Sequence, residues 1–123
     1  AEDPERDFQP CPGTTAFLHL PGGPGVRVDT ALYTGYEVPP YYDSLVAKVL
    51  THAPTRLEAI RRMRRALEEL IVEGYPTNGP LAHRIMHDPE FVRGRYDTSY
   101  LDKNLERLLE LARTCDRLME GEA

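Results

Sequence analysis

The 123-residue sequence has no tryptophan, two cysteines and no apolar run long enough to cross a membrane. Cys11 and Cys115 lie far apart, without a Cys-x-x-Cys pattern or a nearby histidine, so the sequence indicates neither a disulfide framework nor a cysteine metal site. No signal-peptide pattern opens the chain. These absences predict a cytoplasmic, reducing location and leave the roles of the two cysteines open.

An excess of positive charge is also missing, since the formal net charge is −5 at pH 7. A chain of this charge has no general attraction to nucleic acid or to an anionic membrane. One basic cluster, "RRMRR" at residues 61–65, is surrounded by glutamates on the same segment. We therefore expect a solvated helix face there rather than an anion site.

The chain further lacks an initial methionine and an evident first element, because it begins "AEDPERDFQP". We expect it to be a fragment of something larger. Its length suits a single domain with one core, residues 1–123, and is too short for two.

The first half of the chain contains short strand-like runs separated by proline and glycine turns. Residues 15–20 and 26–32 are rich in β-branched or apolar side chains, and residues 44–53 read as a mostly buried strand. In the second run, alternation places Arg27 and Asp29 on one face of the strand.

The second half has the periodicity of helices. Thr55 and Glu58 form a capping-box pattern, apolar residues then recur at three- and four-residue steps, and Gly74 is the predicted stop. Further helical segments are expected at residues 78–87, 89–94 and 100–119, with Cys115 on the apolar stripe of the last. Strands followed by helices predict the α+β class, with antiparallel strands of the first half packed against helices of the second.

The stretch "GGPGVR", residues 22–27, raises the question of a phosphate-binding loop. Such a loop needs backbone N–H groups at the start of a helix, whereas a strand-like run follows here and Pro24 lacks an N–H group. The pattern favours a hairpin turn that places Arg27 on the following strand. The residues alone favour a surface ion pair of Arg27 with Asp29 or with a glutamate, with a functional role for Arg27 as the alternative.

No complete catalytic set is present. His83 and His87 have the four-residue spacing of a zinc pair, but the residues between them lack the glutamate of the His-Glu-x-x-His motif and no third ligand is marked. We therefore expect no metal site. No Ser/His/Asp or Cys/His arrangement can be traced either.

Several uncommon strings give the chain a resemblance to a known family. They are "AEDP", the Phe8–Gly13 segment, "PGGPGVRVD", "GYEVPPYYDSLVAKV", "EGYPTN" and "SYLDKNL". In this order and spacing, they resemble the C-terminal domain of biotin carboxylase over nearly the whole chain, up to about Leu109.

The resemblance implies part of an ATP-grasp ligase that uses ATP and Mg²⁺ to activate bicarbonate as carboxyphosphate and then carboxylates biotin on a carrier protein or domain. It implies that Arg27 is catalytic and contacts the biotin ureido oxygen and bicarbonate. It also places Thr98 on the adenine side of ATP, and His52 and Arg56 in the region where family members form homodimers.

The family's catalytic lysines, Mg²⁺-binding glutamates and general base all lie upstream of "AEDP", so this chain alone is expected to bind no nucleotide tightly and to be inactive. Its ending soon after "YLDKNLERLL" favours a free-standing subunit of acetyl-CoA carboxylase, an enzyme of fatty acid biosynthesis. The alternative is a non-catalytic domain for assembly or dimerisation.

Overall fold

The computed structural model describes residues 1–121, apart from the side chain of Met119. Short strands dominate the first half of the chain and helices the second. The elements in chain order are β1 (Glu2–Asp3), η1 (Pro4–Arg6), β2 (Gln9–Pro10), β3 (Gly13–Thr14), β4 (Phe17–His19), β5 (Val26–Thr30), β6 (Glu37–Val38), β7 (Ala47–Thr51), α1 (Arg56–Glu69), β8 (Ile71–Glu73), α2 (Gly79–Ile85), α3 (Pro89–Val92) and α4 (Tyr100–Met119).

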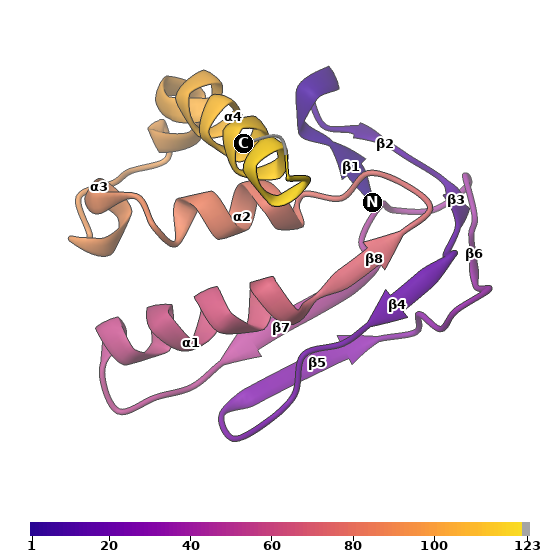
Figure 1. Cartoon of the computed structure of the whole chain (residues 1–123), viewed down its shortest axis with the longest axis horizontal. Helices are drawn as coiled ribbons and strands as arrows, with labels where there is room; N and C mark the ends of the chain where they lie inside the picture. The colour runs from indigo at the N-terminus through magenta and orange to yellow at the C-terminus, as the bar shows by residue number, and fades with distance from the viewer. Residues whose placement is uncertain (122–123) are drawn as a thin grey trace.

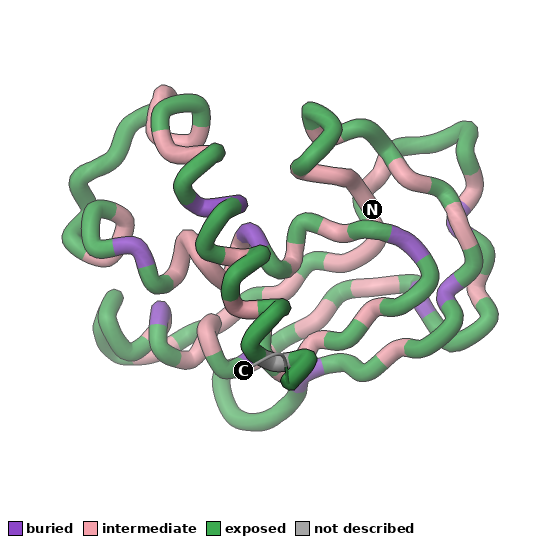
Figure 2. The backbone as a smooth tube through the Cα atoms, turned by 45° about the horizontal axis from the view of Figure 1, so that its top comes forward, coloured by how far each residue is buried: buried purple, intermediate pink, exposed green. Residues whose placement is uncertain are grey.

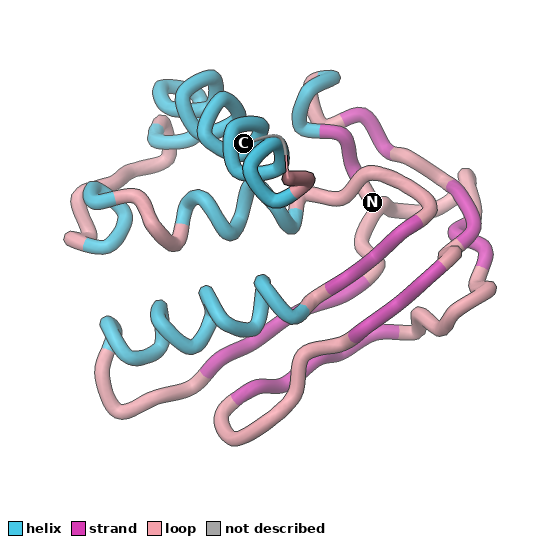
Figure 3. Tube along the Cα trace, in the orientation of Figure 1, coloured by secondary structure: helices cyan, strands magenta, loops and turns pink. Residues whose placement is uncertain are grey.

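The strands form four antiparallel pairs, β1–β2, β3–β6, β4–β8 and β5–β7. α1 lies along the β5–β7 pair, α2 packs against α1, and α4 packs against α2. Strands and helices therefore occupy separate sides of the molecule, as Figures 1 and 3 show. The predicted α+β class is confirmed.

The prediction of a hairpin around "GGPGVR" is wrong. The segment joins β4 to β5, but β4 pairs with β8 and β5 pairs with β7. The loop is fixed instead by long-range contact, because the N–H of His52 donates to the carbonyl of Gly25 at 2.9 Å. Local turn chemistry predicts a bend correctly, but the strand partners come from distant parts of the chain.

The strand predicted at residues 44–53 is β7, and it is less buried than expected. Its residues alternate between half-buried and exposed, and Leu50 retains 42% exposure. β5 alternates in the same way, with Val26 and Val28 turned inward and Arg27 and Asp29 turned outward. One face of the β5–β7 pair is therefore exposed.

α1 begins where the capping box predicts, since the Thr55 hydroxyl accepts a hydrogen bond from the Glu58 N–H at 3.2 Å. It ends at Glu69 rather than at Gly74, because Ile71–Glu73 forms β8 and pairs with β4. Gly74 has φ +122°, and a Cβ atom there would collide with the Thr14 carbonyl. This glycine permits the close approach of two segments and does not end the helix.

The later helices lie close to their predicted bounds. α2 ends at Ile85, two residues before the predicted end. The Asn78 side chain forms no cap, and the Thr77 hydroxyl instead accepts from the Gly79 N–H at 3.3 Å. Cys115 on α4 is half-buried, and it and Cys11 are free thiols.

Within the described residues 1–121, the core consists of two small clusters rather than one. Leu32, Val38 and Tyr75 form one cluster beneath the strands, while Leu81, Leu108 and Leu109 form the other between α2 and α4. Most of the backbone in Figure 2 is exposed or half-buried. Within residues 1–121, no helix combines the length and apolar character needed to span a bilayer.

Candidate functional site

Arg27 lies on the exposed face of β5, directly after the glycine-rich loop. Its side chain is 71% exposed, and its cross-strand partner on β7 is Leu50. Asp29, two residues further along, points to the same side and lies opposite Lys48. The alternation along the two paired strands therefore places the cations Arg27 and Lys48 and the carboxylate of Asp29 on the same exposed face.

The Arg27 guanidinium donates two hydrogen bonds to the Asp29 carboxylate. Nε donates to Oδ1 at 2.9 Å and Nη2 donates to Oδ2 at 2.7 Å. These hydrogen bonds, with the attraction between the charges, raise the pKa of Arg27 and lower the pKa of Asp29. The ion pair expected from the residues is therefore present, and it fixes the direction in which the guanidinium lies.

The loop before Arg27 is tied to the start of α1. Gly25 has φ +72°, and a Cβ atom there would collide with the Arg62 guanidinium and lie 2.5 Å from the His52 carbonyl oxygen. Arg62 Nη1 donates to that same carbonyl at 2.6 Å. Glycine is required at position 25, because both the backbone conformation and the close packing exclude a side chain.

The "RRMRR" cluster is only partly the solvated face that its charge pattern predicts. Arg61 and Arg65 are exposed, but Arg62 and Arg64 are half-buried. Arg64 Nε donates to the Met86 carbonyl at 2.8 Å and so links α1 to the end of α2. Two of the arginines thus serve as donors to backbone carbonyls, a role that net charge does not reveal.

Thr98 belongs to the connection between α3 and α4. That connection lies away from β5 in Figure 1. The Thr98 side chain is exposed, and the turn around it is held by Asp97, whose Oδ1 accepts from the N–H and the hydroxyl of Ser99 at 2.9 and 2.5 Å. Within residues 1–121, no hydrogen bond or ion pair joins Thr98 to Arg27. The structure does not bring the two predicted site residues together.

His52 and Arg56 flank the start of α1, and both are exposed. Arg56 is already engaged within the chain, because its Nη2 donates to the Phe91 carbonyl at 2.7 Å and its guanidinium lies over the rings of Phe91 and Tyr96. The carbonyl of His52 accepts from Arg62, as described above, which leaves the imidazole at the surface.

A cavity of about 490 Å³ lies between β7, α1 and α2. Its lining is mostly aliphatic and includes Val49, Met63, Leu67 and Met86. Arg27, Thr98, His52 and Arg56 are not among its lining residues. The hollow is therefore separate from the polar side chains singled out above.

Asp29 and Lys48 are the site neighbours to which the sequence patterns assign no function. Those patterns indicate only that Asp29 can be a surface partner of Arg27 and that Lys48 falls within the run expected to be a mostly buried strand. The alternation of residues 26–30 and 47–51 is the available signal, but the strand register that sets Asp29 opposite Lys48 requires the structure.

The comparisons with known proteins agree on one family. The family model for the biotin carboxylase C-terminal domain matches residues 1–103. The chain is 52% identical over 105 residues to biotin carboxylase of Pseudomonas aeruginosa and 48% identical over 103 residues to that of Nostoc sp., alignments that cover 85% and 84% of this chain and 23% of each relative.

A solved structure gives the same answer for the fold. The biotin carboxylase domain dimer of Hydrogenobacter thermophilus 2-oxoglutarate carboxylase, in complex with MgADP, ADP and bicarbonate, matches with a TM-score of 0.85 and 44% identity. The match covers 88% of this chain and 24% of that one. The chain spans about a quarter of the length of these relatives, and it belongs to the biotin carboxylase C-terminal domain family.

Proposed function

We propose that this chain supplies the C-terminal part of an ATP-dependent biotin carboxylase and that Arg27 acts at the site where biotin and bicarbonate react. The single observation that carries the proposal is the match to the family over residues 1–103, within which Arg27 stands exposed on a paired strand. The H. thermophilus relative is described in complex with bicarbonate, which supports an anion as one substrate.

Arg27 retains donors for a ligand while it is bound to Asp29. A guanidinium has five N–H groups, and Asp29 engages one on Nε and one on Nη2, so both hydrogens of Nη1 remain available. When the ureido nitrogen of biotin loses its proton, negative charge develops on the ureido oxygen. A guanidinium already oriented at that oxygen stabilises the developing charge.

Asp29 is a positioning residue in this proposal. Its two hydrogen bonds hold the plane of the guanidinium, so that less conformational freedom is lost when a ligand binds. Lys48 lies opposite Asp29 on β7 and lowers the pKa of the Asp29 carboxyl slightly further, after the larger effect of Arg27. The three side chains carry a net charge of +1, which suits an anionic substrate.

ATP and Mg²⁺ belong to the parent enzyme in this proposal. Mg²⁺ prefers oxygen ligands, and the carboxylate beside Arg27, Asp29, is already engaged by the guanidinium. Thr98, the residue expected on the adenine side, lies on a different part of the fold from Arg27. These residues do not fit a complete nucleotide site, and we assign them no step through nucleotide or metal.

The test is Arg27→Ala in the full-length protein that carries this chain, assayed for carboxylation of free biotin. We expect kcat to fall about 100- to 1000-fold, the range for loss of one donor to a developing oxyanion, with the thermal unfolding unchanged. Arg27→Lys should recover little activity, because a lysine lacks the fork of donors. The matched control is Arg6→Ala, which removes another exposed, ion-paired arginine. An unchanged kcat in Arg27→Ala contradicts the assigned role.

The proposal includes a homodimer that uses the surface around His52 and Arg56, and a biotin carboxyl carrier as partner. The H. thermophilus relative is described as a domain dimer, which supports the first part. His52→Glu in the full-length protein should shift the mass measured by light scattering towards the monomer. His19→Glu, at an exposed histidine on β4, is the control and should leave the mass unchanged.

The proposed parent is acetyl-CoA carboxylase of the cytoplasm, with its role in fatty acid biosynthesis. The relatives also include a subunit of pyruvate carboxylase from Methanothermobacter thermautotrophicus, with 45% identity over 103 residues, 84% of this chain and 21% of that relative. Purification of the native complex and assay with acetyl-CoA and with pyruvate separate these parents. A native protein no larger than this chain would instead favour the assembly or dimerisation domain.

A further inference from the structure

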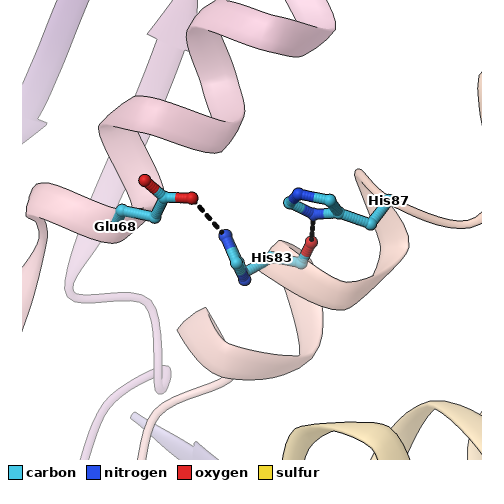
Figure 4. A group of neighbouring side chains, drawn as sticks. All are labelled: Glu68, His83 and His87. Atoms are coloured by element: carbon cyan, nitrogen blue, oxygen red, sulfur yellow. Dashed lines mark hydrogen bonds and ion pairs between the residues drawn. The ribbon is translucent and has the colours of Figure 1, made fainter. Parts of the chain in front are cut away.

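Three side chains with metal-binding atoms meet between α1 and α2, away from Arg27. Glu68 comes from α1, His83 from α2 and His87 from the turn that follows α2 (Figure 4). Their ligand atoms all lie within 4.8 Å of one another. The sequence alone predicts no metal site because it marks no third ligand, and the packing of α1 against α2 brings one into place.

The hydrogen bond of the His87 ring leaves its other nitrogen free for a ligand. His87 Nδ1 lies 3.0 Å from the His83 carbonyl oxygen, which can only accept, so Nδ1 carries the hydrogen. In a neutral imidazole, Nε2 then keeps its lone pair free. A backbone carbonyl that fixes the tautomer of a ligand histidine is a common feature around protein metal ions.

His83 and Glu68 are already at the separation that two ligands of one ion adopt. His83 Nε2 lies 3.1 Å from Glu68 Oε1. With metal–ligand bonds of about 2.0–2.1 Å, two ligands of a tetrahedral ion stand roughly 3.3 Å apart. Glu68 and His87 are exposed, so their side chains can close on an ion without disturbing a packed core.

Binding requires one rearrangement at His83. Arg84 Nη2 lies 3.2 Å from His83 Nδ1 and donates to it, which leaves the hydrogen on Nε2, facing Glu68. An ion between His83 and Glu68 takes the place of that hydrogen. The hydrogen then moves to Nδ1, and the Arg84 side chain turns away into solvent.

The ligand set selects the kind of ion. Two imidazoles and one carboxylate suit Zn²⁺ and neighbouring transition metals, whereas Mg²⁺ and Ca²⁺ prefer sites made of oxygen atoms. Three protein ligands leave a fourth position for water. We propose that Glu68, His83 and His87 form a Zn²⁺-type transition-metal site that links α1 to α2.

The test is calorimetric titration of the 123-residue chain with ZnCl₂, with MgCl₂ as the matched ion control. We expect saturable binding of Zn²⁺ and no binding of Mg²⁺. His83→Ala and His87→Ala should each weaken Zn²⁺ binding at least about tenfold, on the scale seen when the surroundings of protein metal ions are altered. His19→Ala, which removes an exposed histidine outside the cluster, should leave the affinity unchanged.

A second measurement separates this site from adventitious binding elsewhere, for example at the thiols. On addition of Zn²⁺, the imidazole ¹⁵N resonances of His83 and His87 should shift together at one equivalent, while those of His19 and His52 stay in place. The melting temperature should rise with Zn²⁺ in the original chain and not in His87→Ala, since binding to the folded state stabilises it. No saturable binding, or equal affinity in the His83→Ala and His87→Ala variants and the original chain, overturns the proposal.

Discussion

At the scale of single residues, Gly25 shows how backbone conformation supports the Arg27 site. It combines φ +72° with contact to the Arg62 guanidinium and the His52 carbonyl, just two residues before Arg27. A side chain here would strain the backbone and push apart the loop, β7 and α1. The position of Arg27 therefore depends on a residue that contributes no functional group.

Gly25→Ala tests this dependence. We expect it to lower the free energy of unfolding by roughly 1–3 kcal/mol, because a non-glycine residue at positive φ is strained and its Cβ collides with neighbouring atoms. Gly22→Ala is the matched control, since no atom lies within 4 Å of its added Cβ and its φ is not in the left-handed region. Urea unfolding of both variants makes the comparison, and equal stability of the two would contradict the steric argument.

The sequence predicts single residues well where the cause is local. Alternation places Arg27 and Asp29 on the same strand face, and their expected ion pair is present. Arg56 is expected at a dimer surface, but it also binds the Phe91 carbonyl, 35 positions away. The contact between Glu68 and His83 is also long-range, because the packing of α1 against α2 brings the two residues together. No local sequence pattern reveals it.

At the scale of elements, the start of α1 could be predicted and its end could not. Thr55 marks the start, because its hydroxyl accepts a hydrogen bond from the N–H of Glu58 in the first turn of the helix. At the other end, the apolar run continues through Ile71, so helical periodicity extends past the true boundary. Pairing of Val72 with Leu18 converts this stretch to a strand, and that competition lies outside any local pattern.

The junction of α3 and α4 offers an element-scale prediction about pH. Burial, together with the hydrogen bond from the Tyr100 hydroxyl to Asp88 Oδ2 at 2.7 Å, raises the pKa of Tyr100 to about 12. In the unfolded chain the tyrosine pKa is about 10. The folded state therefore holds this proton more tightly, and its contribution to stability is complete below pH 10 and is lost as the pH rises towards 12.

Tyr100→Phe should remove that part of the loss of stability at alkaline pH. We expect the free energy of unfolding of the original chain to fall more steeply between about pH 10 and pH 12 than that of the variant, as measured by urea unfolding at each pH. Tyr96→Phe is the control, because the Tyr96 hydroxyl forms no hydrogen bond with any of residues 1–121. Parallel pH profiles for the original chain and Tyr100→Phe would rule out the proposed linkage.

At the scale of the whole molecule, much apolar surface remains uncovered. Phe17, Leu50 and Ile71 are 46%, 42% and 40% exposed, and the first two lie on strands that present an outward face. The core of the part that the structure describes consists of two small clusters, and the relatives are about four times as long as this chain. These features accord with the proposal that the domain packs against further protein in a longer enzyme.

The sharpest whole-molecule prediction concerns nucleotide binding. Arg27 and Thr98 occupy separate parts of the fold, and the carboxylate beside Arg27 is engaged by the guanidinium, so these three residues provide no converging set of ligands for ATP and Mg²⁺. Calorimetry of the 123-residue chain with MgATP should show no tight binding, whereas the full-length protein should bind it, and Thr98→Ala should weaken that binding. A micromolar Kd for the isolated chain would place a nucleotide site within residues 1–123 and would overturn the proposal that this site lies in the remainder of a longer enzyme.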